Sequence, residues 1–238
     1  MCSHRTIIIL SFSDKTLEER VEYLEQISKV NTLKSCSEYA YHGVDLSGMY
    51  QIDPDGEHGH PPIDVFCDFD AGSTTIFHDH MFVVEIDHCS GPMCYQLDLD
   101  YHVPQGQIEA LIQNSESCSQ DLSFNCVDAA LSANGESIGA WLNRNGMEET
   151  YFVGANHGDH VCTCGLNETC SDSDHGRTCN CDATQIPELQ NDNGTITNAT
   201  ALPITGFRYG ELEYDLQEAS IYISELKCKD IPFNGRPR

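Results

Sequence analysis

The sequence predicts a disulfide-rich α+β domain, built mostly of short antiparallel strands with a few helices. Short alternating apolar runs, separated by Gly- and Pro-rich turns, are typical of antiparallel strands. Two other segments have apolar residues at helical spacing. The chain of 238 residues holds 13 Cys, which indicates extensive crosslinking. This length suffices for one large domain or two small ones.

The first segments are read as a leader and a stem. Residues 1–13 have a basic start, a short apolar run and small residues before a cut after Ser13. They are interpreted as a weak signal segment or as the ragged start of an incomplete chain. Cleavage would remove Cys2 and leave an even number of cysteines. Residues 14–33 have helical spacing and form a short helical stem, which either joins subunits or packs on its own domain.

The body of the chain is predicted from residue 35 to residue 230, followed by a tail at 231–238. Its first strands are expected at Ile63–Cys67, Thr74–Phe77, Phe82–Asp87 and Tyr95–Tyr101. A helix has Pro104 in its first turn and ends before Cys118. Asn145-Gly146 predicts a hairpin between Ile138–Leu142 and Glu149–Val153, and Ala219–Leu226 forms a late strand. Residues 154–194 have few large apolar side chains and form a loop region held by crosslinks instead of a core.

The charge is strongly negative, with a formal net charge of −26. No Lys or Arg lies between Lys34 and Arg144, so the carboxylates of that stretch have no salt-bridge partners within it. Such a surface repels nucleic acid, and a nucleic-acid-binding function is excluded. The acidic face is either solvated without a specific ligand or the seat of weak calcium binding at many sites. No run reaches the ~18–20 apolar residues of a membrane span, so none is expected.

The cysteines allow two chemistries, zinc binding and disulfides. Cys162, Cys164, Cys170, Cys179 and Cys181 lie near His157, His160 and His175, but the CxC spacing is uncommon in zinc sites. Three N-glycosylation sequons, at Asn167, Asn193 and Asn198, lie in or just after the same region and favour secretion. We therefore expect disulfides in an oxidising compartment. The bonded residues would be Cys36, Cys67, Cys89, Cys94, Cys118, Cys126, Cys162, Cys164, Cys170, Cys179, Cys181 and Cys228.

Several polar clusters qualify as sites and are weighed against simpler interpretations. His78-Asp79-His80 has two His on one face if it is a strand, which suits zinc or copper, but no third ligand is apparent and a polar strand end is favoured. His58 and His60 are expected in an exposed loop. Asp53-Pro-Asp55-Gly-Glu57 imitates a calcium loop without completing it. No catalytic motif is present in the sequence, so we expect that the protein is not an enzyme and has no catalytic residue. We also expect no resident metal.

The order of motifs resembles the fibrinogen-like domain family. The opening motifs are Ser35-Cys36-Ser-Glu38, Ser47-Gly48-Met-Tyr50-Gln-Ile52-Asp53-Pro54-Asp55-Gly56 and Ile63-Asp-Val65-Phe66-Cys67-Asp68. The later part is similar to the divergent fibrinogen-like segment of contactin-associated and neurexin-type ectodomains. It matches in the stretches Gln107–Ile112, Cys162-Thr-Cys164-Gly165, Asn180-Cys181-Asp182 and Leu226-Lys-Cys228.

This resemblance implies a fibrinogen-like fold and two disulfides, Cys36–Cys67 and Cys118–Cys126. Cys89 and Cys94 have no counterpart in the family and are assigned to each other. The family's calcium loop and ligand pocket have no match in residues 154–194, so neither is assigned.

The function expected from these observations is that of a secreted, acidic, non-catalytic fibrinogen-like glycoprotein of the extracellular matrix. Its acidity is similar to that of proteins in a calcium-rich or mineralised matrix, such as a coral skeletal organic matrix. In biomineralization, its carboxylates would bind calcium weakly at many sites. Its partners would then be matrix components or a mineral surface. The alternative is a cell-adhesion or recognition module that binds a protein partner at the cell surface.

Overall fold

The computed structural model describes residues 16, 20, 32–133, 135–152, 159–171, 176–183 and 188–232. Two compact units share the chain. The first contains Met1–Thr75, Val103–Glu116 and Cys228–Arg238, and the second contains Ile76–His102 and Ser117–Lys227. Residues 1–13, most of the predicted stem at 14–33 and the tail beyond residue 232 lie outside the described residues.

In the first unit, helix α2 (Cys36–Tyr41) begins at a side-chain cap. Ser35 Oγ accepts the backbone N–H of Glu38 at 3.2 Å, and the Glu38 carboxylate accepts the N–H of Lys34 at 2.8 Å. This reciprocal arrangement satisfies two N–H groups that the helix itself leaves unbonded. The sequence pattern did not predict this short helix.

Strands β1 (Gly48–Ile52), β2 (Ile63–Asp68) and β3 (Ser73–Ile76) follow as an antiparallel set. Ile63, Val65 and Cys67 of β2 are buried, and Asp64 between them is exposed, which is the period of a strand with one face on a core. The chain later contributes α3 (Gln105–Gln113) and β14 (Leu226–Asp230). Pro104 precedes α3, and Ile108, Leu111 and Ile112 are buried, so the predicted second helix is confirmed.

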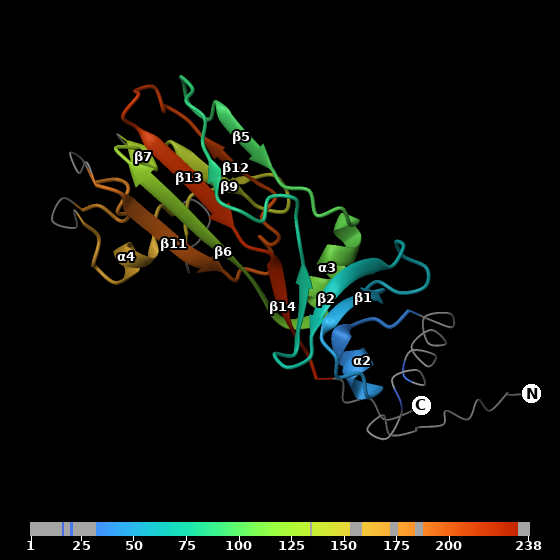
Figure 1. The fold of residues 1–238 in the computed structure, drawn as a ribbon. Coiled ribbons are helices and arrows are strands. Elements are labelled where there is room, and N and C mark those ends of the chain that lie inside the picture. The colour runs from blue at the N-terminus through green and yellow to red at the C-terminus, as the bar shows by residue number, and fades with distance from the viewer. Residues whose placement is uncertain are drawn as a thin grey trace, which may run out of the picture. The chain divides into compact units, whose positions relative to one another are not determined.

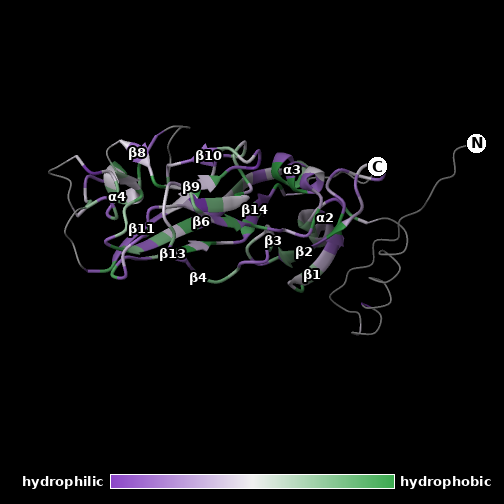
Figure 2. Ribbon diagram, turned by 90° about the horizontal axis from the view of Figure 1, so that it is seen from above, coloured by the Kyte–Doolittle hydropathy of each residue, from purple (hydrophilic) through white to green (hydrophobic). Residues whose placement is uncertain are grey.

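The second unit is organised around the long strand β6 (Ser115–Val127), whose residues 117–127 lie in this unit. Hydrophobic and hydrophilic residues alternate along it, as Figure 2 shows. It pairs with β13 (Glu218–Ile223) on one side and β11 (Gln190–Ile196) on the other. β4 (Val84–Glu85) pairs with the far side of β13 and ends the sheet. Figure 1 shows β11, β6 and β13 side by side.

A second sheet in this unit has the order β10 (Glu148–Glu149), β9 (Gly139–Leu142), β12 (Gly206–Tyr209) and β5 (Tyr95–Asp98). Its side chains pack against the first sheet. The ring of Phe124 on β6 lies 5.9 Å from that of Phe207 and 5.2 Å from that of Tyr209, both on β12. All three are fully buried, and they form the core between two antiparallel sheets.

The expected α+β fibrinogen-like fold is therefore wrong. Among the described residues with assigned elements, strands predominate, and helix is confined almost entirely to α2, α3 and the single turn α4 (Thr163–Leu166). A small two-stranded sheet, β7 (Ser132–Ala133) and β8 (Glu136–Ser137), adds to the strands. Two antiparallel sheets that pack face to face fit a β-sandwich, and the helical content is too small for an α+β domain.

Most predicted strands are present with shifted ends. The Asn145-Gly146 turn joins β9 to β10, and Gly146 has φ = 73°, a backbone conformation that glycine adopts without strain. The strand expected at 82–87 is limited to Val84–Glu85, and the loop region expected at 154–194 contains α4 and part of β11.

The disulfides correct one predicted pair. Cys36–Cys67 and Cys89–Cys94 are bonded as expected. Cys118 does not bond Cys126, because both lie on β6, where eight extended residues span about 26 Å and a disulfide requires Cα atoms within about 7 Å. Cys126 bonds Cys181 instead. The loop region holds Cys162–Cys179 and Cys164–Cys170, and Cys118 and Cys228 are also disulfide-bonded.

The sequence separation of each disulfide predicts how much it stabilises the fold. Cys126–Cys181 closes 55 residues and Cys89–Cys94 closes 5. Chain entropy then gives about 4 kcal/mol for the first and about 2 kcal/mol for the second. We expect the double variant C126A/C181A to lose about 2 kcal/mol more unfolding free energy than C89A/C94A, measured by denaturant unfolding. Equal losses would contradict the entropic origin.

Candidate functional site

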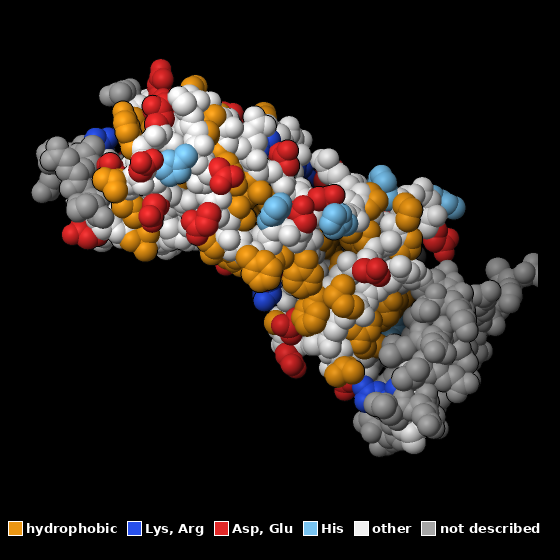
Figure 3. All heavy atoms as spheres, turned by 45° about the horizontal axis from the view of Figure 1, so that its top comes forward, with side chains coloured by type: hydrophobic (Ala, Val, Ile, Leu, Met, Phe, Trp, Pro, Cys, Tyr) orange, Lys and Arg blue, Asp and Glu red, His pale blue; other side chains and the backbone are white. Residues whose placement is uncertain are grey.

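The surface is acidic in the structure as in the sequence. Figure 3 shows Asp and Glu side chains scattered over the face drawn, with few Lys or Arg among the coloured side chains. Ion pairs among the described residues include Arg208–Asp98 at 2.5 Å and Lys229–Glu116 at 2.9 Å. Other carboxylates accept backbone N–H groups, as Asp68 does from Ala71 at 2.9 Å. Solvation and capping thus account for part of the charge without a bound cation.

The His78-Asp79-His80 cluster is not arranged as a metal or catalytic site. It lies after β3 and not within a strand, so its two His do not share a strand face. His78 is buried, and its Nε2 lies 3.1 Å from the carbonyl oxygens of both Ile223 and Ser224. Its Nδ1 accepts the N–H of His80 at 3.1 Å. Both ring nitrogens are occupied within the protein, and burial lowers the pKa of His78.

The acidic turn at Asp53-Pro-Asp55-Gly-Glu57 is fastened by protein groups. Asp53 Oδ1 accepts the Gly56 N–H at 3.2 Å and the Gln107 side-chain amide at 2.9 Å. The backbone N–H and the ring Nδ1 of His60 both lie 2.8 Å from Asp55 Oδ2. These bonds hold the pKa of Asp55 below its ordinary value. The carboxylates here hold a turn together, and His58 and His60 are exposed as expected.

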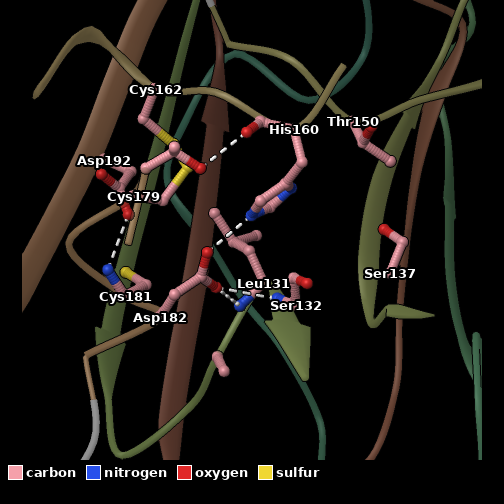
Figure 4. Close-up of polar contacts among 12 residues, drawn as sticks. Leu131, Ser132, Ser137, Thr150, His160, Cys162, Cys179, Cys181, Asp182 and Asp192 are labelled. Carbon is pink, nitrogen blue, oxygen red and sulfur yellow. Dashed lines mark hydrogen bonds and ion pairs between the residues drawn. A yellow bond between two sulfur atoms is a disulfide. The ribbon is translucent and has the colours of Figure 1, made fainter. Parts of the chain in front are cut away.

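The densest polar cluster lies in the crosslinked loop region of the second unit. Figure 4 shows the Cys162–Cys179 disulfide near Cys181, with Asp192 pointing toward Cys181 and with His160 and Asp182 pointing toward each other. Three disulfides tie this region to itself and, through Cys126, to β6. The cluster is therefore held rigidly on the sandwich.

Asp182 organises one half of the cluster. It is 4% exposed, and its Oδ1 accepts the N–H of Leu131 at 3.1 Å and of Ser132 at 2.8 Å. Its Oδ2 lies 2.6 Å from His160 Nε2. The carboxylate supplies acceptors to backbone N–H groups of a segment remote in the sequence, which would otherwise be left without partners in a buried place.

Asp192 organises the other half. It is 1% exposed, and its two oxygens accept the N–H of Asn180 at 2.8 Å and of Cys181 at 2.7 Å. Desolvation raises the pKa of Asp192, and the two backbone donors oppose that rise without overcoming it. A buried carboxylate thus positions the loop that carries Cys179 and Cys181.

This cluster has the residue types of a metal site but not the chemistry. His160, Cys179 and Asp182 form one close group, and Cys162, Cys179 and Asp192 form another. A cysteine binds zinc as its thiolate, and the sulfurs of Cys162 and Cys179 are bonded to each other, so neither group has its cysteine ligands. His157 and His175, the other residues of the zinc interpretation, lie outside the described residues.

The three sequons are on the surface. Asn167, Asn193 and Asn198 are exposed, and so are Thr169, Thr195 and Thr200 of the same sequons. Their exposure allows access by a glycosyltransferase, and glycosylation itself stays a prediction. Leu166, which is 54% exposed, directly precedes Asn167 and would lie beside a glycan at that site.

A second exposed feature is the segment from Phe77 to Asp87, named here the β4 edge. Phe82 is 83% exposed and Val83 is 53% exposed. β4 is the last strand of its sheet, and Ile86 donates its N–H to Ala219 at 2.9 Å, so the backbone groups of Glu85 point away from β13. The edge therefore offers unpaired strand backbone beside large apolar side chains.

Sequence reasoning missed the roles of Asp182 and Asp192. Both are acidic residues next to or near cysteines in a segment poor in apolar residues. That pattern is the only signal in the sequence, and it does not tell which carboxylates turn inward.

The comparisons agree on one group of relatives, although no protein-family model matches the chain. The chain is 30% identical over 200 residues to contactin-associated protein 1 of Rattus norvegicus, and it has the same identity to the Homo sapiens protein. In both cases the aligned region covers 82% of this chain and 14% of the relative. It is 30% identical over 189 residues to neurexin-4 of Drosophila melanogaster, which covers 75% of this chain and 14% of that protein. The chain thus spans about one seventh of the length of the relatives it matches.

These findings support the extracellular part of the prediction. The chain is homologous to a segment of contactin-associated protein 1 and of neurexin-4, and its disulfides are typical of an oxidising compartment. In the described part of the chain, every helix is too short or too polar to cross a bilayer.

The two oxygens of Asp182 have separable roles, and this predicts a graded response. Asp182→Ala removes the acceptor of two buried N–H groups and should cost about 2–4 kcal/mol of unfolding free energy. Asp182→Asn keeps Oδ1 and should cost roughly half as much or less. Denaturant unfolding of both variants measures the difference. If the two variants lose the same stability, the charge facing His160 matters and the backbone acceptor does not.

The raised pKa of Asp192 predicts a pH dependence of stability. The folded chain binds this proton more tightly than the unfolded chain, in which the pKa of Asp is about 4. As pH rises from 4 through the folded-state pKa, the wild type should lose stability relative to Asp192→Asn, which does not ionise. Urea unfolding of both proteins between acid and neutral pH measures this difference. A wild type that gains relative stability over that interval would show that the backbone donors outweigh desolvation.

Proposed function

We propose that the chain is a non-catalytic recognition module of an extracellular protein, which binds a protein partner at a cell surface. The observation that carries this proposal is the similarity over 82% of the chain to contactin-associated protein 1, whose name states an association with contactin. The similarity to neurexin-4 supports the same reading from a distant organism. The partner's class is accordingly a cell-surface protein.

The structure supplies a surface suited to this role. Phe82 and Val83 on the β4 edge expose large apolar side chains, and a partner that covers them gains the free energy of removing that surface from water. The segment from residue 76 to residue 102 carries no sequon, so glycans attached at the three predicted sites would not start from it. A strand of the partner can also pair with the outward backbone of Glu85.

A non-catalytic role is supported by the use of the polar clusters. His78 has both ring nitrogens bonded to backbone groups, and both oxygens of Asp192 accept backbone N–H groups. Asp182 accepts two backbone N–H groups on Oδ1 and contacts the His160 ring with Oδ2. Groups that are bonded in this way hold the fold in place and are not poised to transfer a proton or attack a substrate.

Association with mineral is the competing role for the acidic surface. The relatives give it no support, and the carboxylates of Asp68 and Asp55 each accept a backbone N–H group. Mineral and calcium binding are therefore outcomes that the experiment below distinguishes.

The glycosylated chain, secreted from cultured animal cells, is applied to cells that display contactin and to the parent cells. We expect saturable, trypsin-sensitive binding that the F82S/V83S variant weakens about tenfold. L189S is the control, because Leu189 is 68% exposed and lies outside the β4 edge.

Calcium carbonate particles provide the opposing arm of the same experiment. If the chain adsorbs to the particles and binds neither cell type saturably, the proposal is wrong and the mineral role replaces it. Equal losses in F82S/V83S and L189S would reject the β4 edge as the contact.

A further inference from the structure

The first unit contains a small cavity of about 290 Å³. Ala40 and Tyr41 of α2, Phe69 and Gly72 of the turn between β2 and β3, and Asp230 and Pro232 at the end of β14 line it. All of these residues belong to the same unit. The cavity lies at the small end of the range for ligand sites, so it fits one amino-acid side chain better than a larger molecule.

Asp230 gives the cavity its chemistry. The residue is 9% exposed, and its Oδ1 accepts the hydroxyl of Thr74 at 2.7 Å. Its backbone N–H donates to the carbonyl of Gly72 at 3.0 Å, which fixes the end of β14 against the turn. Oδ2 accepts no hydrogen bond from the described residues, although the side chain is largely removed from water. Asp230 thus lines the cavity with a carboxylate of which only Oδ1 has a hydrogen-bond partner among the described residues.

Lys229, the cationic residue next to Asp230 in the sequence, forms an ion pair with another carboxylate. Lys229 Nζ lies 2.9 Å from Glu116 Oε2, so it does not neutralise Asp230. Burial raises the pKa of Asp230, and the Thr74 hydroxyl only partly offsets this effect. The contrast with Asp182 is clear, since both oxygens of Asp182 have partners.

The lining selects the kind of group that fits. An anion would be repelled by the carboxylate, and a purely apolar group would leave Oδ2 buried without a partner. A guanidinium supplies N–H donors in a plane, is weakly hydrated, and stacks on aromatic rings such as those of Tyr41 and Phe69. An ammonium is more strongly hydrated and stacks less well.

We propose that this cavity binds an arginine side chain presented by the partner protein, with the guanidinium on Asp230 and its plane against Tyr41 or Phe69. The proposal rests on the proposed function for the source of the arginine. The β4 edge belongs to the other unit, so the cavity is a contact additional to that edge.

The test uses the isotope-labelled full chain at neutral pH and N-acetyl-arginine methylamide as the probe. N-acetyl-citrulline methylamide has nearly the same shape without the charge and serves as the ligand control. We expect saturable amide shifts at Tyr41 and Gly72 with the arginine probe and none with citrulline.

Variants locate the interaction. Asp230→Asn keeps an Oδ1 acceptor for Thr74 and should weaken probe binding about tenfold or more. Asp70→Asn makes the same change of net charge at an exposed residue of the β2–β3 turn that does not itself line the cavity, and it should leave binding unchanged. Tyr41→Ala, at a residue that is 41% exposed, is a second variant that removes the stacking surface without opening the core.

Three results would overturn the proposal. Citrulline binds as well as arginine, D70N weakens binding as much as D230N, or the probe binds only after Arg236 and Arg238 of the chain's own tail are replaced by alanine. The last result would identify the tail as the occupant. If the chain binds contactin-displaying cells but shows no Asp230-dependent amide shift with the arginine probe, only the arginine-site proposal is wrong. If it shows that amide shift but binds no cells, only the proposed function is wrong.

Discussion

The Cys126–Cys181 bond fastens the loop region of the second unit to β6, the strand on which both β11 and β13 pair. That loop region has few large apolar residues, so it cannot hold its position by burying a core of its own. Crosslinks reduce the entropy of the unfolded chain and substitute for the missing apolar contacts. The positions of His160, Asp182 and Asp192 follow from this covalent anchoring.

Buried carboxylates complete what the disulfides begin. Asp182 and Asp192 are surrounded by backbone N–H donors, which replace the water that each carboxylate loses on burial. Asp230 differs, because one of its oxygens accepts a side-chain hydroxyl and the residue lines a cavity. In a chain with a net charge of −26, the carboxylates that carry structural or binding roles are thus distinguished by their partners and not by their number.

Local patterns predicted the local elements well. Pro104 and the spacing of Ile108, Leu111 and Ile112 identified α3, and Asn145-Gly146 identified the β9–β10 hairpin, because each signal lies within a few residues. The α+β fold class was wrong, because local patterns and the resemblance do not reveal how sheets pack. That packing depends on contacts such as Phe124 with Tyr209, far apart in the sequence. The homology to contactin-associated protein 1 and neurexin-4 agrees with the family that the sequence resembled, but the fibrinogen-like fold inferred from that resemblance was wrong.

Long-range pairings escaped the sequence for the same reason. Cys118 and Cys126 are close in the sequence, yet the strand that contains both holds them apart, and nothing local reveals that the strand continues through them. The inward orientation of the Asp182 and Asp192 side chains, like the cavity at Asp230, also depends on segments remote in the chain. The exposed sequons, by contrast, follow from polar sequence around them.

The central claim is that oxidised sulfur and not metal holds the loop region, and disulfide mapping tests it most directly. Partial reduction with stepwise alkylation is needed, because Cys162 and Cys164, like Cys179 and Cys181, are separated by a single residue. Mass spectrometry of the secreted chain should find Cys126 joined to Cys181 and Cys162 joined to Cys179, with neither pair alkylated before reduction. Free sulfhydryls on Cys162 and Cys179 together with stoichiometric zinc would contradict the account.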